Sequence, residues 1–191
     1  MPFIGQHVKR VHVTGGPGSG KTTLARGVAR VLDAPLYELD AILLEAGDNI
    51  AQVTLGQRPP HLAAQEAWVS DGVYFGWAAP FLESAHLIVC LDTPWRVAGY
   101  RILMRHIRAE LSRNNPFPGW GRLSRFLRWS YRYYHEGNPD SLDALGVPET
   151  RSVRMRALEQ YRDKLVTCYT TSDTARLLRD LRASRGDLDA N

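Results

Sequence analysis

The sequence GGPGSGKTT occupies positions 15–23 and is the most informative stretch of the chain. It matches the phosphate-binding pattern in which a glycine, four free positions and then Gly-Lys-Ser/Thr follow one another. Glycines permit the positive φ angles of a loop wrapped around a phosphate, so that backbone N–H groups converge on an anion. The residues predicted to bind a nucleotide are Gly15, Gly16, Pro17, Gly18, Ser19, Gly20, Lys21, Thr22 and Thr23.

Two side chains of this loop are expected to carry chemistry. Lys21 would supply a positive charge to the β- and γ-phosphates of ATP, and the Thr22 hydroxyl is placed to ligate Mg²⁺. The flanks fit, because residues 8–14 alternate like a strand and residues 22–32 carry apolar side chains at helical spacing. A glycine-rich turn without a ligand is the alternative. The sequence thus predicts an ATP and Mg²⁺ site and leaves the substrate open.

The composition is that of an ordinary globular protein. The 191 residues are 44% hydrophobic and 23% charged, which fits a single domain over residues 1–191. No apolar run approaches the length of a membrane span and no signal-peptide pattern is present, so we expect a cytoplasmic protein that does not enter a membrane. Cys90 and Cys168 fall in predicted core strands and are expected to be reduced and buried. The oligomeric state stays open.

Positive charge gathers in one part of the chain. Eight arginines and two carboxylates lie between Arg101 and Glu136. Arg101, Arg105 and Arg108 are spaced by four and three, so they share one face of a helix predicted over 95–113. Guanidinium groups suit phosphate oxygens and the charge that develops in phosphoryl transfer. Arg101 and Arg105 are therefore predicted to be catalytic, and Arg105 also to bind the nucleotide; a solvated basic face is the alternative.

Acidic residues close two of the predicted strands. The strand over 35–40 carries Glu38 and Asp40, which a period of two places on one face, and the strand over 67–72 carries Asp71 near its end. Ligands of open parallel sheets lie beyond the carboxyl ends of the strands. We therefore predict Glu38 and Asp71 as metal-binding residues, and Asp40 and Asp71 as catalytic residues facing an acceptor hydroxyl. The alternatives are a helix N-cap for Asp40 and an Asp-Gly turn for Asp71.

Three further positions are candidates with equally simple alternatives. Asp92 ends the apolar strand over 86–92 and competes with Asp71 for the metal, unless it forms a turn or cap with Thr93-Pro94. Trp77 would either wall an acceptor pocket or pack in the core. Ser172 lies in a turn before the last helix, which would border the purine of the nucleotide or serve only as a cap.

The remaining segments are predicted as connecting loops, helices and one strand. A helix over 122–136 interleaves arginines with aromatic residues, which is typical of a nucleic-acid surface or of a lid helix that packs its aromatics on the body. Loops are expected over 45–60, 112–121 and 137–148, a helix over 149–164, a strand over 165–169 and a loose tail from Ser184.

The order of these features resembles that of the adenylate-kinase-like P-loop proteins. The features are the phosphate loop, the acids at Asp40 and Asp71, the strand ending in Asp92 and the arginine helix. The likeness is greatest to the topology-modulation proteins, and Glu38-Leu39-Asp40 resembles the acid-x-acid triplet of shikimate kinases. The resemblance implies a three-layer α/β/α P-loop NTPase fold. Its five-stranded parallel sheet would have the order 2-3-1-4-5, and residues of about 100–148 would form a helical arginine-rich lid.

The resemblance also implies an ATP-dependent phosphotransferase. The acceptor would be a small molecule, either nucleoside- or nucleotide-like or another hydroxyl compound. The basic aromatic helix supports an alternative from another class, a nucleotide-dependent nucleic-acid-binding or regulatory ATPase.

Overall fold

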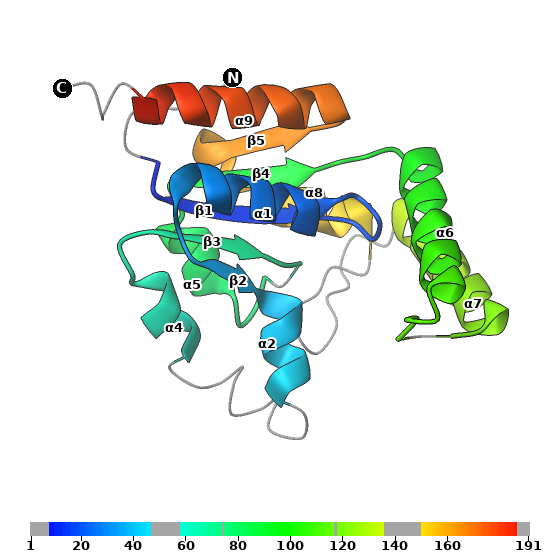
Figure 1. Ribbon diagram of the computed structural model, residues 1–191. Helices are drawn as coiled ribbons and strands as arrows, with labels where there is room; N and C mark the ends of the chain where they lie inside the picture. Colours follow the sequence, from blue (N-terminus) through cyan, green and yellow to red (C-terminus); the bar gives the residue numbers. More distant parts are fainter. Residues whose placement is uncertain (1–7, 47–57, 74, 117, 136–149, 187–191) are drawn as a thin grey trace.

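A computed structural model of the protein describes residues 8–46, 58–73, 75–116, 118–135 and 150–186. Its centre is a sheet of five parallel strands in the order β2-β3-β1-β4-β5 (Figure 1). The strands are β1 (Arg10–Gly15), β2 (Leu36–Glu38), β3 (Trp68–Asp71), β4 (Leu87–Leu91) and β5 (Leu165–Cys168). The predicted fold class and strand order are confirmed.

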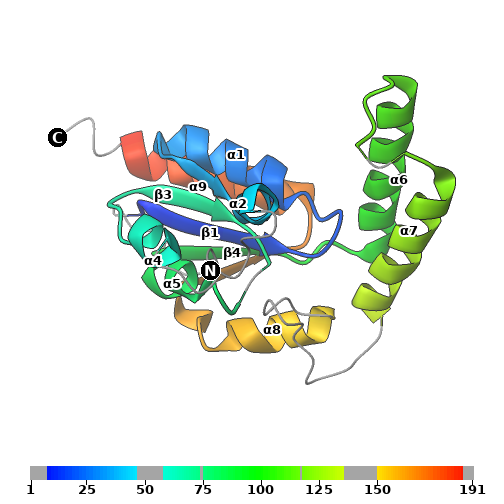
Figure 2. The same ribbon diagram turned by 90° about the horizontal axis from the view of Figure 1, so that it is seen from below.

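Helices cover both faces of the sheet (Figure 2). One face carries α1 (Lys21–Leu32) and α9 (Thr171–Gly186), and the other carries α4 (Arg58–Ala63), α5 (Ala79–Ser84) and α8 (Arg151–Glu159). The helix α2 (Leu39–Ala46) follows β2, and a 3₁₀ turn η2 (Arg162–Lys164) precedes β5. Beyond the carboxyl ends of the strands, α6 (Trp95–Leu111) and α7 (Trp120–His135) form a helical hairpin.

The sheet separates two hydrophobic cores. Val11 and Val13 of β1 pack with α1 and α9, whereas Trp68 of β3 packs with α5 and α8 on the other face. The Trp68 ring meets Phe81 edge-on at 5.1 Å, and both side chains are fully buried. Burying one such side chain stabilises a fold by about 1.5–3 kcal/mol. The rigid sheet fixes where the strand ends, and therefore where the functional side chains, come to lie.

The predicted strand over 35–40 is too long, and this changes the geometry of its two acids. β2 ends at Glu38, and α2 begins at Leu39, whose side chain is fully buried. Asp40 therefore lies in the first turn of a helix, where a negative charge interacts favourably with the helix dipole. The expectation that Glu38 and Asp40 share a strand face is wrong; a helix does begin here, but at Leu39, so Asp40 lies inside its first turn and is not its N-cap.

Other element boundaries also differ from the prediction. The predicted helix over 149–164 is divided into α8 and η2, and α9 continues to Gly186, so Ser184 is helical rather than part of a loose tail. Most of the predicted loop over 45–60, and all of that over 137–148, lies outside the described residues. Cys90 and Cys168 are free and buried, as predicted. Among the helices that the structure describes, none is long and apolar enough to cross a membrane.

Candidate nucleotide-binding site

The phosphate loop joins β1 to α1 in a shape that only glycine permits at several positions. Gly18 and Gly20 adopt left-handed φ angles of 71° and 97°. A Cβ atom at Gly15 would lie 2.6 Å from the Ser19 Oγ, so there is no room for a side chain at this position either. The Ser19 N–H donates to the Gly16 carbonyl oxygen at 3.2 Å and closes the turn. The sequence motif thus has the local structure that an anion-binding loop requires.

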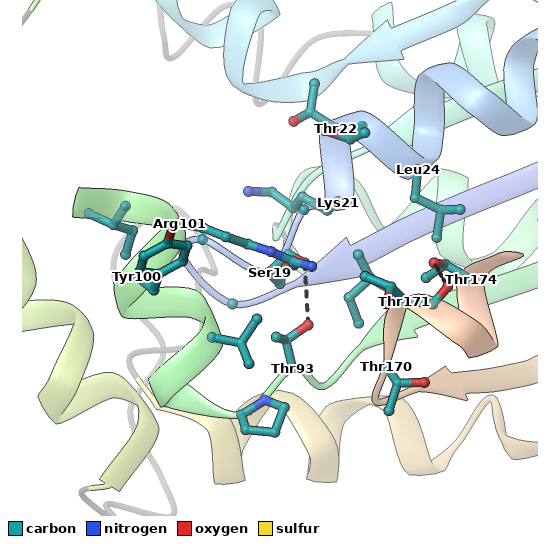
Figure 3. A pocket seen from close by; sticks show the side chains of 18 of the residues that line it. Ser19, Lys21, Thr22, Leu24, Thr93, Tyr100, Arg101, Thr170, Thr171 and Thr174 are labelled. Carbon is teal, nitrogen blue, oxygen red and sulfur yellow. Dashed lines mark hydrogen bonds between the residues drawn. The ribbon is translucent and has the colours of Figure 1, made fainter. Parts of the chain in front are cut away.

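A cavity of about 810 Å³ opens beside this loop (Figure 3). The loop contributes Gly16, Gly18, Ser19, Gly20, Lys21, Thr22 and Thr23, α6 contributes Tyr100, Arg101, Arg105 and Arg108, and the start of α9 contributes Thr171 and Thr174. Its volume is in the range of small-molecule and cofactor sites. Of the predicted nucleotide-binding residues, Gly15, Pro17 and Ser172 do not line the cavity, and Thr171 and Thr174 lie where Ser172 was expected to act.

Two acids meet the beginning of α1 beside the loop. The Thr22 hydroxyl donates a hydrogen bond of 2.5 Å to the Asp71 Oδ2, and the Lys21 Nζ lies 4.0 Å from the Asp40 Oδ2. Asp71 is buried, and this burial raises the pKa of its carboxyl group, although the nearby charge of Lys21 and the bond from Thr22 act in the opposite direction. The structure therefore brings Lys21, Thr22, Asp40 and Asp71 together, as the sequence analysis proposed.

The chemistry of Thr22 and Asp71 fits a Mg²⁺ ion. The Asp71 Oδ1 is buried and has no hydrogen-bond partner among the described residues. Buried carboxylate oxygens are normally satisfied, so this oxygen is suited to bind a cation or a water molecule. Hydroxyl and carboxylate oxygens are ligands that Mg²⁺ accepts, usually with several retained waters. Glu38, in contrast, pairs with Arg26 at 2.7 Å on the side of α1, so it is already engaged with another charge.

The α6–α7 hairpin holds the outer side of the phosphate loop. The Arg101 Nη1 donates to the Ser19 carbonyl oxygen at 2.6 Å, and the Tyr134 hydroxyl donates to the Pro17 carbonyl oxygen at 3.0 Å. Gly16 is covered so closely that a Cβ atom there would lie 2.7 Å from the Tyr134 oxygen. Sequence analysis found Arg101 but missed Tyr134, because nothing in the helical pattern shows which aromatic ring turns toward the loop.

Asp92, the second candidate for the metal, lies in an ion-pair cluster with two arginines. Arg151 binds both of its carboxylate oxygens, at 2.7 Å and 2.5 Å, and Arg154 binds one of them at 3.0 Å. Arg154 is fully buried beneath the ring of Tyr133, and its Nε and Nη1 have no hydrogen-bond partner among the described residues. Sequence analysis named neither arginine. Trp77, the proposed pocket wall, packs against the core on the α5 face.

The loop, its flanking strand and helix, and the strand order together define a P-loop α/β protein. Comparison with known sequences agrees with this class. The model of the ATPase family associated with various cellular activities (AAA) matches residues 11–64, which include most of β1, the loop, α1 and β2. A shikimate kinase of Rhodococcus jostii (strain RHA1) is 40% identical over 55 residues, a match that spans 28% of this chain and 33% of that protein.

Solved structures are similar over most of the chain at low sequence identity. A gluconokinase from Sinorhizobium meliloti 1021 is 16% identical, with 95% of this chain and 94% of that chain covered and a TM-score of 0.47. A shikimate kinase from Acinetobacter baumannii in complex with shikimate is 17% identical, with 92% of each chain covered and a TM-score of 0.47. Likenesses this distant do not bear on the reaction. The resemblance to the adenylate kinase and shikimate kinase group is confirmed, whereas that to topology-modulation proteins stays a prediction.

Proposed function

We propose that the protein is an ATP-dependent kinase that transfers the γ-phosphoryl group to a hydroxyl group of a small molecule. The observation that carries this proposal is the position of two different acids beside Lys21. Asp71 is buried and bonded to Thr22, whereas the Asp40 side chain is 52% exposed and lies 4.0 Å from Lys21. An acid on the open side can orient and deprotonate the nucleophile, which in a kinase is the acceptor hydroxyl.

Each residue then has a separate role. Lys21 and the loop N–H groups hold the β- and γ-phosphates, and Thr22 and Asp71 hold Mg²⁺, which when bound neutralises charge on the phosphate oxygens. Asp40 orients the acceptor hydroxyl and takes its proton. Arg101 and Arg105, which line the cavity, stabilise the negative charge that develops on the transferring group. The hairpin, as part of the lid expected over 100–148, keeps water from competing with the acceptor.

The acceptor is proposed to carry an anionic group besides its hydroxyl. Three arginines of α6, Arg101, Arg105 and Arg108, line the cavity, and their guanidinium groups suit the oxygens of an anionic ligand. The shikimate kinase relative acts, by its name, on a small hydroxylated acid, which is the same class of molecule.

The test is transfer of label from γ-³²P-ATP and Mg²⁺ to pooled acceptors. Three pools separate the classes: hydroxylated carboxylic acids, neutral sugars with nucleosides, and phosphorylated sugars with nucleotides. We expect label in an acidic pool. Label released only as inorganic phosphate in every pool would identify a bare ATPase and overturn the kinase proposal. Label in the neutral pool alone would contradict the proposal that the acceptor carries an anionic group.

Substitution of the two neighbouring acids provides a matched comparison. Asp40→Asn is expected to lower the transfer rate by about a hundredfold, the size of a general-base contribution, with little change in ATP affinity. Glu38→Gln changes the same charge two residues earlier, where the side chain is paired with Arg26, and is expected to leave the rate within about twofold. Equal losses in the two variants would contradict the role given to Asp40.

A further inference from the structure

The excess positive charge of the protein lies in the α6–α7 hairpin. Residues 95–135 contain nine arginines and a single acid, Glu110, so the hairpin contributes +8 to a chain whose net charge is +4. The remainder of the chain is therefore negative. Glu110 accepts hydrogen bonds from the Asn115 side chain and from the Gly119 N–H, which directs it into the hairpin turn. Such a separation of charge indicates a polyanionic partner on the hairpin side.

One side of α7 presents this charge together with aromatic rings. We call it the α7 face and define it by Arg122, Arg125, Phe126, Trp129 and Arg132, all of which are exposed. Phe126 and Trp129 stack on each other, with ring centroids 5.5 Å apart and planes inclined by 29°. The adjoining side of the helix buries Leu123, Ser130 and Tyr133, and Arg122 and Phe126 also line a cavity of about 520 Å³ together with residues of α6. All five residues of the α7 face nevertheless keep exposed surface that a partner can reach.

This surface is separate from the nucleotide cavity. The cavity takes its arginines from α6, and no residue of α7 lines it among those that the structure describes. The apolar stripe of α7 is already used for packing, and the exposed rings stand between arginines rather than apart from them. A helix that lies in a membrane surface needs its apolar and its charged side chains on separate faces. The α7 face mixes aromatic rings with arginines, so it is poorly suited to a lipid surface.

We propose that the α7 face binds a single-stranded polynucleotide. Bases stack on the Phe126–Trp129 pair, and phosphates bind Arg122, Arg125 and Arg132. Every base has a π face, so such stacking needs no particular sequence, and arginine forks suit phosphate oxygens. The face extends over about 15 Å of helix, the length of about four nucleotides stacked at ~3.4 Å each. This activity is additional to the proposed kinase reaction and does not depend on it.

The test is fluorescence anisotropy of labelled 20-nucleotide single strands, RNA and DNA in separate arms, titrated with the full chain between 50 and 300 mM KCl. Three phosphate contacts predict that log K falls with log[KCl] with a slope of about −2. Replacing Arg122, Arg125 and Arg132 together by Gln is expected to bring the slope close to zero. Trp129→Ala is expected to weaken binding by about tenfold through loss of stacking.

The matched control is a variant that loses the same three positive charges on the exposed side of α9. Arg176, Arg179 and Arg182 are exposed on α9, and their joint replacement by Gln is expected to leave affinity and slope unchanged. Circular dichroism and thermal protection by ATP establish that every variant is folded. No binding at 50 mM KCl, equal binding of heparin or duplex DNA, or equal losses in the α7 and α9 variants would overturn the proposal.

Discussion

Asp71 and Asp92 illustrate how the surroundings of one residue type set its role. Asp71 ends β3 and Asp92 follows β4, the two strands that flank β1, and both carboxyl groups are buried. Asp71 is bonded to the neutral Thr22 hydroxyl, with one oxygen left without a partner among the described residues, so burial opposes its charge. Asp92 is bound by two guanidinium groups that balance its charge. The first is suited to bind a cation, and the second to join α8 to the sheet.

The environment of Asp71 predicts that removal of its charge stabilises the protein while it lowers activity. Burial raises the pKa of Asp71 above the ordinary 3.8, so the folded chain releases this proton at a higher pH than the unfolded chain does. The charge-related cost is absent below pH 3.8 and complete above the raised pKa. Asp71→Asn is therefore expected to raise the free energy of unfolding at pH 7, and this advantage should vanish at low pH. Urea titrations across pH measure it, and transfer should fall about a hundredfold.

Asp92→Asn is expected to have the opposite effect on stability. It removes the charge that balances the fully buried Arg154, and breaking a buried ion pair from one side costs about 3–5 kcal/mol. In a chain of this size the melting temperature should fall by about 10 °C. Asp180→Asn on the exposed side of α9 is the control. A stable Asp92→Asn variant that has lost Mg²⁺-dependent ATP binding would contradict the structural role and support Asp92 as a metal ligand.

At the scale of elements, the hairpin and the phosphate loop act as one unit. The Tyr134 hydroxyl and the Arg101 guanidinium each hold a loop carbonyl oxygen, so the loop is tied to α7 as well as to α6. Tyr134→Phe removes one hydrogen bond of about 1 kcal/mol and is expected to raise the KM for ATP about fivefold at an almost unchanged kcat. Tyr131→Phe, on the exposed side of the same helix, should not change KM. If both variants behave as wild type, the Tyr134 contact does not support the loop.

The predictability of the elements follows from the range of the interactions that form them. The strand, loop and helix over 8–32 are encoded by local periodicity and by glycines, so they were predicted from the sequence, as was the strand order through the resemblance. The start of α2 depends on burial of Leu39, a tertiary effect that a short alternating pattern cannot reveal. The pairs of Asp92 with Arg151 and Arg154 join residues about sixty positions apart, for which no local signal exists.

At the scale of the whole molecule, the nucleotide cavity is lined from several distant segments. The phosphate loop, α6 and the start of α9 all contribute to it, so a bound nucleotide should oppose global unfolding. At a concentration a hundred times its Kd, ATP with Mg²⁺ should stabilise the fold by about 2.7 kcal/mol and raise the melting temperature by about 5–10 °C. Lys21→Met should show no such shift. Equal protection of this variant would place the nucleotide elsewhere.

The position of β1 has a consequence for how the protein is made. This strand is the first of those that the structure describes, yet it lies in the middle of the sheet, where its neighbours are β3 and β4 rather than β2. During synthesis both of its edges stay unpaired until residues 68–71 and then 87–91 have left the ribosome. The emerging segment carries the apolar side chains of Val11 and Val13 and has two open edges, a form that invites aggregation or chaperone binding. The strand that carries the phosphate loop is therefore paired on both edges only after about half of the 191 residues have been made.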